Sequence, residues 1–149
     1  MSQGKPEETL DYTNMIMCCD GDINKSNALK HFHCDRKKQE TPIHFTPFDQ
    51  HAIDTISYSS RTGEIRSSNP VYDTDINEVL NLNLELLKAN RLAVLKGVIV
   101  MLGAKKQWKK SEIGALLQSY STKNNDSKKK ENCGIVIWFL SMRLKNANL

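Results

Sequence analysis

The sequence predicts an α+β fold with one short β-hairpin and a helical C-terminal region. Polar and apolar residues alternate in TISYSS and again in GEIRSS, with a glycine-containing turn between them, which is typical of two paired strands. Residues 73–149 instead carry apolar residues at three- and four-residue spacing, which favours helices. We therefore expect a Cys/His-rich region with the hairpin in residues 1–70 and helices in residues 71–149, together forming one compact unit.

The N-terminal region is predicted to contain little regular structure before the hairpin. Residues 1–50 are polar and are broken by Pro42 and Pro47. One short helix is expected to start near Asp35, because aspartate is a favourable helix cap and DRKKQE contains good helix formers. Pro42 is expected to end this helix, because proline lacks the backbone donor that a helix interior needs. The hairpin itself is expected within residues 51–70.

Four helices are predicted after the hairpin. Asp73 or Thr74 is expected to cap a short one through INEVLNL, and a long one follows over residues 84–103. The predicted inward side chains of the long helix are Leu84, Leu87, the Arg91 stem, Leu95, Val98, Met101 and Leu102. A third helix is expected to be capped by Ser111, with Leu116, Leu117 and Tyr120 inward. The last begins near Cys133, with one core face made of Ile135, Trp138, Phe139 and Met142.

The composition favours a globular cytoplasmic protein with no membrane partner. The chain has 149 residues, of which 26% are charged and 39% hydrophobic. No segment reaches the roughly 18–20 apolar residues of a membrane span, and MSQGKPEETLDY lacks the apolar core of a signal peptide. The net charge of +4 permits a nucleic-acid partner, and basic residues gather at 36–38, 105–110 and 123–130. Trp108 could stack on a base, although packing at a helix boundary is the favoured interpretation.

The cysteines and histidines near the N-terminus suggest a metal site. Zinc prefers four ligands from thiolate and imidazole groups, and in a reducing compartment a Cys cluster beside His points to metal before a disulfide. Cys19 and Cys34 are separated by 14 residues, and the further candidates are Cys18, His31 and His33. This spacing alone leaves two interpretations open: a zinc site, or buried free cysteines with surface histidines. Cys133 is most simply a small buried residue at a helix start.

Several motifs together resemble a known family. Asn14 lies five residues before Cys19, and residues 33–38 form a His-Cys-x-x-Lys-Lys element. The hairpin phrase SYSSRTGEI, the LNLN phrase at residues 80–83 and the closing CGIVIWFL follow in order. On these motifs the chain from Leu10 onward resembles the C-terminal part of the HNH-type endonucleases of the Septu and retron-associated anti-phage kind.

The resemblance implies a partial ββα-metal (HNH-like) element packed on a C-terminal helical bundle. In such nucleases a divalent cation, Mg²⁺ or Mn²⁺, binds the scissile phosphate, a His activates water, and Cys pairs hold a structural Zn²⁺. Carried over to this chain, the implied catalytic residues are Asn14, His33 and Asp35. The implied metal ligands are Cys18, Cys19 and Cys34, and the implied DNA-phosphate contacts are Arg36, Lys37 and Lys38.

The chain departs from the family pattern at two points. The first Cys-x-x-Cys pair and the general-base His, which precede the Asn in the family, do not occur here. Asp35 stands where the family has His or Asn, although a carboxylate suits Mg²⁺ and His31 or His33 could approach the metal instead. Three explanations stay open: a fragment of a longer nuclease, a chain completed by another chain, or a non-catalytic descendant.

Two functions from different classes follow. The first is an HNH-endonuclease-like protein or fragment that cleaves DNA phosphodiester bonds in anti-phage defence. The alternative is a non-catalytic binding module that docks a partner ATPase through residues 73–149, because helices 84–103 and 133–145 offer more apolar surface than a small helix set buries. A structural protein without a partner is the least motivated reading.

Overall fold

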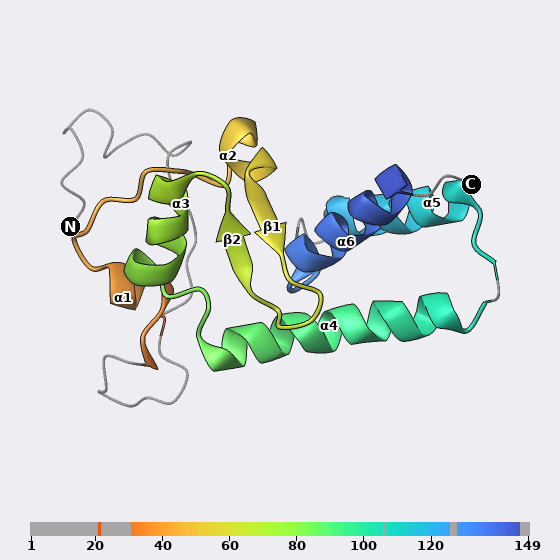
Figure 1. Cartoon of the computed structure of the whole chain (residues 1–149), viewed down its shortest axis with the longest axis horizontal. Coiled ribbons are helices and arrows are strands. Elements are labelled where there is room, and N and C mark those ends of the chain that lie inside the picture. The colour runs from red at the N-terminus through yellow and green to blue at the C-terminus, as the bar shows by residue number, and fades with distance from the viewer. Residues whose placement is uncertain (1–20, 22–30, 106, 126–127, 147–149) are drawn as a thin grey trace. The chain divides into compact units, whose positions relative to one another are not determined.

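The computed structural model confirms an α+β fold in which helices dominate, and the sheet of its described residues is a two-stranded antiparallel hairpin (Figure 1). The structure describes residues 21, 31–105, 107–125 and 128–146. Among the helices of these ranges, none is both long enough and apolar enough to cross a bilayer.

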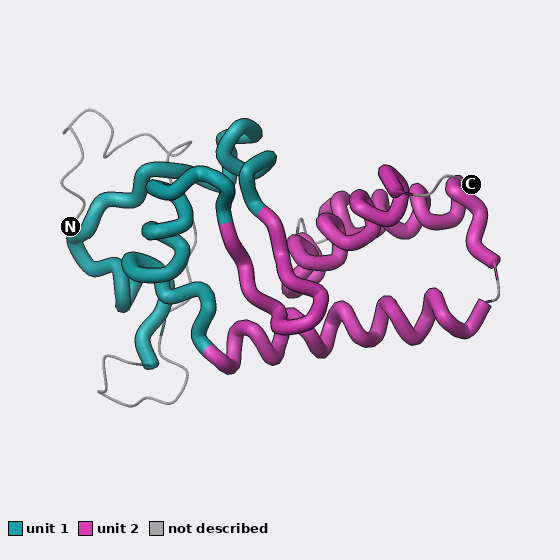
Figure 2. Tube along the Cα trace, in the orientation of Figure 1, with its two compact units in different colours: residues 1–56, 67–84 teal, residues 57–66, 85–149 magenta. Residues whose placement is uncertain are grey.

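The chain divides into two compact units, which Figure 2 colours separately. Their boundaries are residues 1–56 with 67–84 for the first unit, and residues 57–66 with 85–149 for the second. The second unit thus takes in the tip of the hairpin, whereas our sequence division placed the whole hairpin with the N-terminal region. The reason is the chain path, because both strands of the hairpin cross the boundary between the units.

Helix α1 (Cys34–Lys38) confirms the short helix expected near Asp35. It ends at Lys38, and its C-cap Gln39 adopts the left-handed region with φ 49°, so the helix stops before it reaches Pro42, which we expected to end it. Helix α2 (Gln50–Asp54) was not predicted. Its N-cap is Asp49, whose carboxylate accepts the His51 backbone N–H at 2.9 Å, which is the usual capping role of aspartate.

Helix α3 (Pro70–Thr74) begins earlier than predicted and continues directly into the π-helix η3 (Asp75–Val79). Asn69 is the cap, since its side-chain oxygen accepts the Val71 N–H at 3.0 Å and Pro70 occupies the first helical turn. The prediction that Asp73 or Thr74 caps this helix is therefore wrong. The carboxylate of Asp73 instead accepts the Ser67 N–H at 2.9 Å.

The predicted hairpin is confirmed as β1 (Ile56–Tyr58) paired with β2 (Ile65–Ser67). The turn is closed by two backbone hydrogen bonds, from Ser59 N–H to Glu64 O at 2.9 Å and from Gly63 N–H to Ser59 O at 2.8 Å. Gly63 has φ +73°, and a Cβ there would lie 2.4 Å from the Lys88 carbonyl oxygen. A glycine is therefore required at this position, both by the backbone angle and by the close approach of α4.

The second unit is built on three longer helices, α4 (Glu85–Gly103), α5 (Lys110–Ser121) and α6 (Cys133–Asn146). Their buried side chains form one cluster that consists of Leu95, Val98, Leu102, Ile113, Ile135, Val136 and Leu140. Trp108, Leu116, Leu117, Tyr120 and Phe139 are partly buried against this cluster, as the sequence predicted for each of them.

Three details of these helices differ from the predictions. Met101 is 40% exposed and Met142 is 39% exposed, so neither belongs to the core. Met101 lies roughly a quarter of a turn around α4 from the middle of its buried stripe. Helix α6 is apolar on nearly every side, so spacing could not fix which face is buried. Helix α5 begins after Lys109, and Glu112 rather than Ser111 closes its first turn, accepting the Lys109 backbone N–H at 2.9 Å.

Arg91 is buried inside the second unit, as the predicted role of its stem in the apolar face of α4 requires. Its Nη1 donates to the Gly63 carbonyl at 2.7 Å and its Nε to the Leu87 carbonyl at 3.2 Å. Burial lowers the pKa of the Arg91 guanidinium, and desolvation raises the pKa of the nearby Tyr58 hydroxyl. The guanidinium thus fastens the hairpin tip to α4.

Candidate metal and phosphate-binding site

The predicted site falls partly inside and partly outside the described residues. Asn14, Cys18 and Cys19 lie outside them, so their predicted roles stay predictions. The structure places the other half of the site, residues 33–38, in the first unit at the start of and along α1. Among the described residues, no group of three or more His, Cys, Asp and Glu side chains is close enough to hold a metal ion.

His33 and Cys34 bring an imidazole and a thiol together. His33 Nδ1 lies 3.2 Å from Cys34 Sγ, and the His33 side chain is buried, so its interpretation as a surface histidine is wrong. Cys34 has φ +51°, an uncommon backbone angle for a residue with a side chain. The angle is held by a hydrogen bond from the Cys34 N–H to the Leu80 carbonyl at 2.9 Å. This pair combines the two donor types that zinc prefers.

Gly21, which follows Cys19 by two residues, is hydrogen-bonded to His33 of this pair. The Gly21 carbonyl accepts the His33 N–H at 3.0 Å, and Gly21 has φ +71°. A Cβ at Gly21 would lie 2.0 Å from the His33 carbonyl oxygen and 3.0 Å from Arg36 Cβ. Only glycine fits here. Gly21 was not among the predicted site residues, although the Asp-Gly dipeptide directly after the cysteines is a turn signal.

Asp35 and two of the basic residues of α1, Arg36 and Lys37, are exposed, whereas His33 is buried. Asp35 is exposed in the first turn of α1, and Lys37 is exposed in its last turn. The Arg36 guanidinium carbon lies 4.4 Å from the centre of the Phe32 ring, which is a cation–π contact, and Lys38 Nζ donates to the Gln39 carbonyl at 3.2 Å. Lys37 is therefore the side chain of this run best placed to reach a phosphate in solution.

The LNLN phrase holds the start of α1 in place. Asn81, with φ +50°, donates from Nδ2 to the Phe32 carbonyl at 2.8 Å, directly before His33. The neighbouring Leu80 carbonyl receives the Cys34 N–H described above. The Leu82 N–H in turn donates to the Ile76 carbonyl of η3 at 2.8 Å. The phrase that carried the family resemblance therefore positions the Cys/His pair, a role that sequence spacing could not reveal.

The first unit contains a second histidine contact, between His44 and Asp75, which was not predicted from the sequence. Asp75 is 2% exposed, and its carboxylate accepts the His44 backbone N–H at 2.7 Å. His44 Nδ1 lies 3.2 Å from both carboxylate oxygens, while the imidazole is 58% exposed. A buried carboxylate that fixes one ring nitrogen leaves the other directed to solvent, the arrangement seen at histidines that bind metals or move protons.

No protein-family model matches this chain, and comparisons with curated proteins and with solved structures also find no match. The function of this chain therefore has to be inferred from the side chains that the fold brings together.

Proposed function

We propose that this chain is an HNH-endonuclease-like protein that acts on DNA in anti-phage defence, with a structural zinc held near His33 and Cys34. The observation that carries the proposal is the imidazole–thiol pair itself, with Nδ1 and Sγ 3.2 Å apart at the start of a basic helix. A zinc ion bound there would cross-link the N-terminal segment to α1.

The hydrogen bond at Gly21 supports Cys19 and Cys18 as the remaining ligands. Gly21 follows Cys19 by two residues, and two residues of extended chain span at most about 7 Å. Because the Gly21 carbonyl is bonded to the His33 N–H, ligands from this segment would have only a short way to reach Cys34. Two adjacent thiolates with Cys34 and His33 would complete a set of four.

The basic run of α1 supports a DNA substrate. Three consecutive basic residues end this helix, and Arg36 and Lys37 are both exposed. Such side chains neutralise phosphates, so binding should weaken steeply as salt is raised. In the family that the sequence resembles, a Mg²⁺ or Mn²⁺ ion supplies the charge that stabilises the leaving oxygen. Asp35, exposed beside this run, is the carboxylate that we propose as a ligand of that ion.

Metal analysis tests the zinc proposal directly. Purified protein should contain about one zinc per chain, and Cys34→Ser should lose most of it. Cys133→Ser is the matched control, because Cys133 is a free cysteine at the start of α6 in the other unit. Equal zinc content in the two variants would remove His33 and Cys34 from the metal site.

Plasmid nicking tests the proposed DNA cleavage. Supercoiled DNA is incubated with the protein and Mg²⁺ or Mn²⁺, with Lys37→Ala and Asp35→Asn as variants. Activity that resists chelation of the divalent ion, or that is equal in the variants and the parent protein, would contradict the proposed cleavage at α1.

Exposed apolar side chains on α4 favour a second candidate function, docking of a partner ATPase. Ile99, Val100 and Met101 are consecutive and are 42%, 72% and 40% exposed. Exposed apolar side chains grouped in one part of a helix are found at protein contacts. In this case Val100→Asp should abolish co-purification with an ATPase encoded beside this chain, whereas Val71→Asp, at a 48% exposed position of α3, should not. Retained co-purification of the Val100 variant would refute this role of α4.

A further inference from the structure

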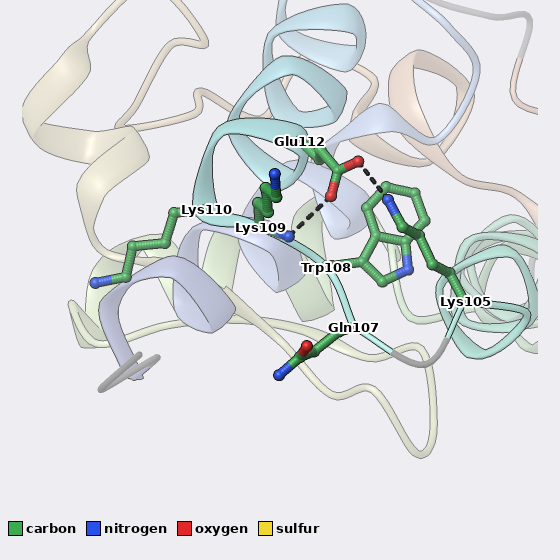
Figure 3. Close-up of a pocket in the computed structure, with 6 residues that line it drawn as sticks. All are labelled: Lys105, Gln107, Trp108, Lys109, Lys110 and Glu112. Atoms are coloured by element: carbon green, nitrogen blue, oxygen red, sulfur yellow. Dashed lines mark hydrogen bonds and ion pairs between the residues drawn. The ribbon is translucent and has the colours of Figure 1, made fainter.

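The junction between α4 and α5 forms a second basic site, separate from the Cys/His region. A pocket of about 410 Å³ is lined there by Lys105, Gln107, Trp108, Lys109, Lys110 and Glu112 (Figure 3). All of these residues belong to the second unit. The ligand of this pocket therefore has to be inferred from the side chains that line it.

Trp108 is a fixed aromatic wall of this pocket. Its Nε1–H donates to the Leu102 carbonyl at 2.8 Å, which satisfies one of the last carbonyls of α4, and the ring is partly buried against the core of the second unit. The indole is thus anchored by its nitrogen, and Trp108 is one of the residues that line the pocket. An aromatic ring held in this way loses little conformational freedom when a flat ligand stacks on it.

The acidic residue of the pocket is already neutralised. One oxygen of Glu112 forms an ion pair with the Lys105 ammonium, and the other accepts the Lys109 backbone N–H at 2.9 Å (Figure 3). The hydrogen bond and charge of Lys105 lower the pKa of the Glu112 carboxyl. Glu112 therefore stays ionised and holds Lys105 near the indole, where its ammonium lies 5.3 Å from the ring centre.

Two lysines of the pocket keep their charge available. Lys109 and Lys110 are exposed, and their ammonium groups have no ion-pair partner among the described residues. In Figure 3 the Lys110 side chain extends away from the indole, so the basic surface continues beyond the pocket. The three described lysines against one glutamate leave a local excess of two positive charges.

We propose that this pocket, called here the Trp108 pocket, binds single-stranded nucleic acid. One unpaired base stacks on Trp108, and the adjacent phosphates contact Lys109 and Lys110. A fixed aromatic surface beside uncompensated lysines fits a strand whose bases are already unstacked, and the recognition is independent of sequence. The inference goes beyond the proposed cleavage, and its test needs no cleavage.

The fluorescence of Trp108 measures the stacking directly. Trp138 is the other tryptophan, packed near Tyr58 with ring centres 6.2 Å apart, so Trp138→Phe leaves Trp108 as the single reporter. Titration with an oligothymidylate at low salt should quench this fluorescence. In the parent protein, Trp108→Phe keeps an aromatic wall and should remove most of the quenching. It provides a second readout if the Trp138 variant does not fold.

Charge-matched variants measure the phosphate contacts. Lys109→Ala with Lys110→Ala should weaken binding on the order of tenfold and lower the slope of log affinity against log salt by about 1.4, at about 0.7 for each phosphate on a single strand. Lys128→Ala with Lys129→Ala is the control, because these exposed lysines also belong to the second unit but lie outside the pocket. Equal effects of the two pairs would refute a defined site.

Three other ligands discriminate among the remaining possibilities. Heparin, which has charge but no bases, should bind without quenching Trp108. ATP should bind much more weakly than the strand, because it offers only one base and one cluster of phosphates. Quenching by heparin, equal affinity for ATP, or equal quenching by polyglutamate would each overturn the proposal. They would indicate, respectively, a non-specific ionic patch, a free-nucleotide site or an acidic protein partner.

Discussion

The contact of His44 with the buried carboxylate of Asp75 predicts how much the free energy of unfolding falls when His44 is replaced. Among the described residues, every hydrogen bond that the Asp75 carboxylate accepts comes from His44, by its backbone N–H at 2.7 Å and by Nδ1 at 3.2 Å. Replacing His44 with Ala removes the imidazole, and the 2% exposed carboxylate then keeps one donor within the described part of the chain, the backbone N–H of residue 44. A hydrogen bond to a charged group contributes about 1.5–3 kcal/mol. Since the backbone donor stays and the imidazole is 58% exposed, we expect a loss near the lower end, about 1.5 kcal/mol.

Denaturant unfolding measures this loss, with His51→Ala as the matched control. His51 is exposed on α2, and none of its ring nitrogens has a partner in the described part of the chain, so its replacement should change stability by less than about 0.5 kcal/mol. A double-mutant cycle with Asp75→Asn should give a coupling energy of about 1 kcal/mol between positions 44 and 75. Equal losses for the two histidine variants, or a coupling near zero, would refute the assigned contact.

Three further predictions concern the second unit. Gly63→Ala should destabilise the protein by at least about 1 kcal/mol, because φ is +73° and the new Cβ would meet a backbone oxygen. Gly97→Ala should stabilise the protein by about 0.5–1 kcal/mol, because Gly97 lies in α4 and no atom is within 4 Å of a Cβ added there. Thermal unfolding should show these two effects with opposite signs. The raised pKa of Tyr58 means that the folded state binds the hydroxyl proton more tightly than the unfolded state does, so the stability linked to this proton is present below pH 10 and is lost as the pH rises above that value. In an alkaline absorbance titration, one tyrosine should ionise at higher pH than the others, and Tyr58→Phe should remove it. The lowered pKa of Glu112 has the opposite effect: the stability linked to its ionised carboxylate is present above about pH 4.5 and is lost as the pH falls below that value. In unfolding experiments at different pH, Glu112→Gln should therefore reduce the loss of stability at acid pH.

The elements with a strong periodic pattern could be predicted from the sequence. Alternation fixed the hairpin, and the three- and four-residue spacing of Leu95, Val98 and Leu102 identified both α4 and its inward face. The face of α6 could not be predicted, because apolar residues surround that helix and any stripe fits. Helix α2 was not predicted because five residues are too few to show a helical spacing of apolar residues. The capping residue Asp49 is the sequence signal for its start.

The candidate site was predictable in its residue types but not in its contacts. His33 and Cys34 are adjacent in the chain, so their proximity required no fold. The carbonyl of Leu80 bonds to Cys34 from 46 residues away, and the side-chain amide of Asn81 bonds to Phe32 from 49 residues away. Hydrogen bonds over such separations leave no pattern in the sequence. The pairing of His44 with Asp75 has the same origin, because nothing local relates two residues 31 positions apart.

The short π-helix η3 has a consequence for how this sequence can vary. Its first residue, Asp75, receives the hydrogen bonds of His44, and the residue directly after it, Leu80, receives that of Cys34. Between them Asn77 and Glu78 are exposed, and the side-chain hydrogen bonds of Asn77 join it to Asp73 and Asn83. We therefore expect this segment to tolerate exchanges of residue type but not an insertion or deletion, because one added or missing residue would move one anchored histidine segment relative to the other.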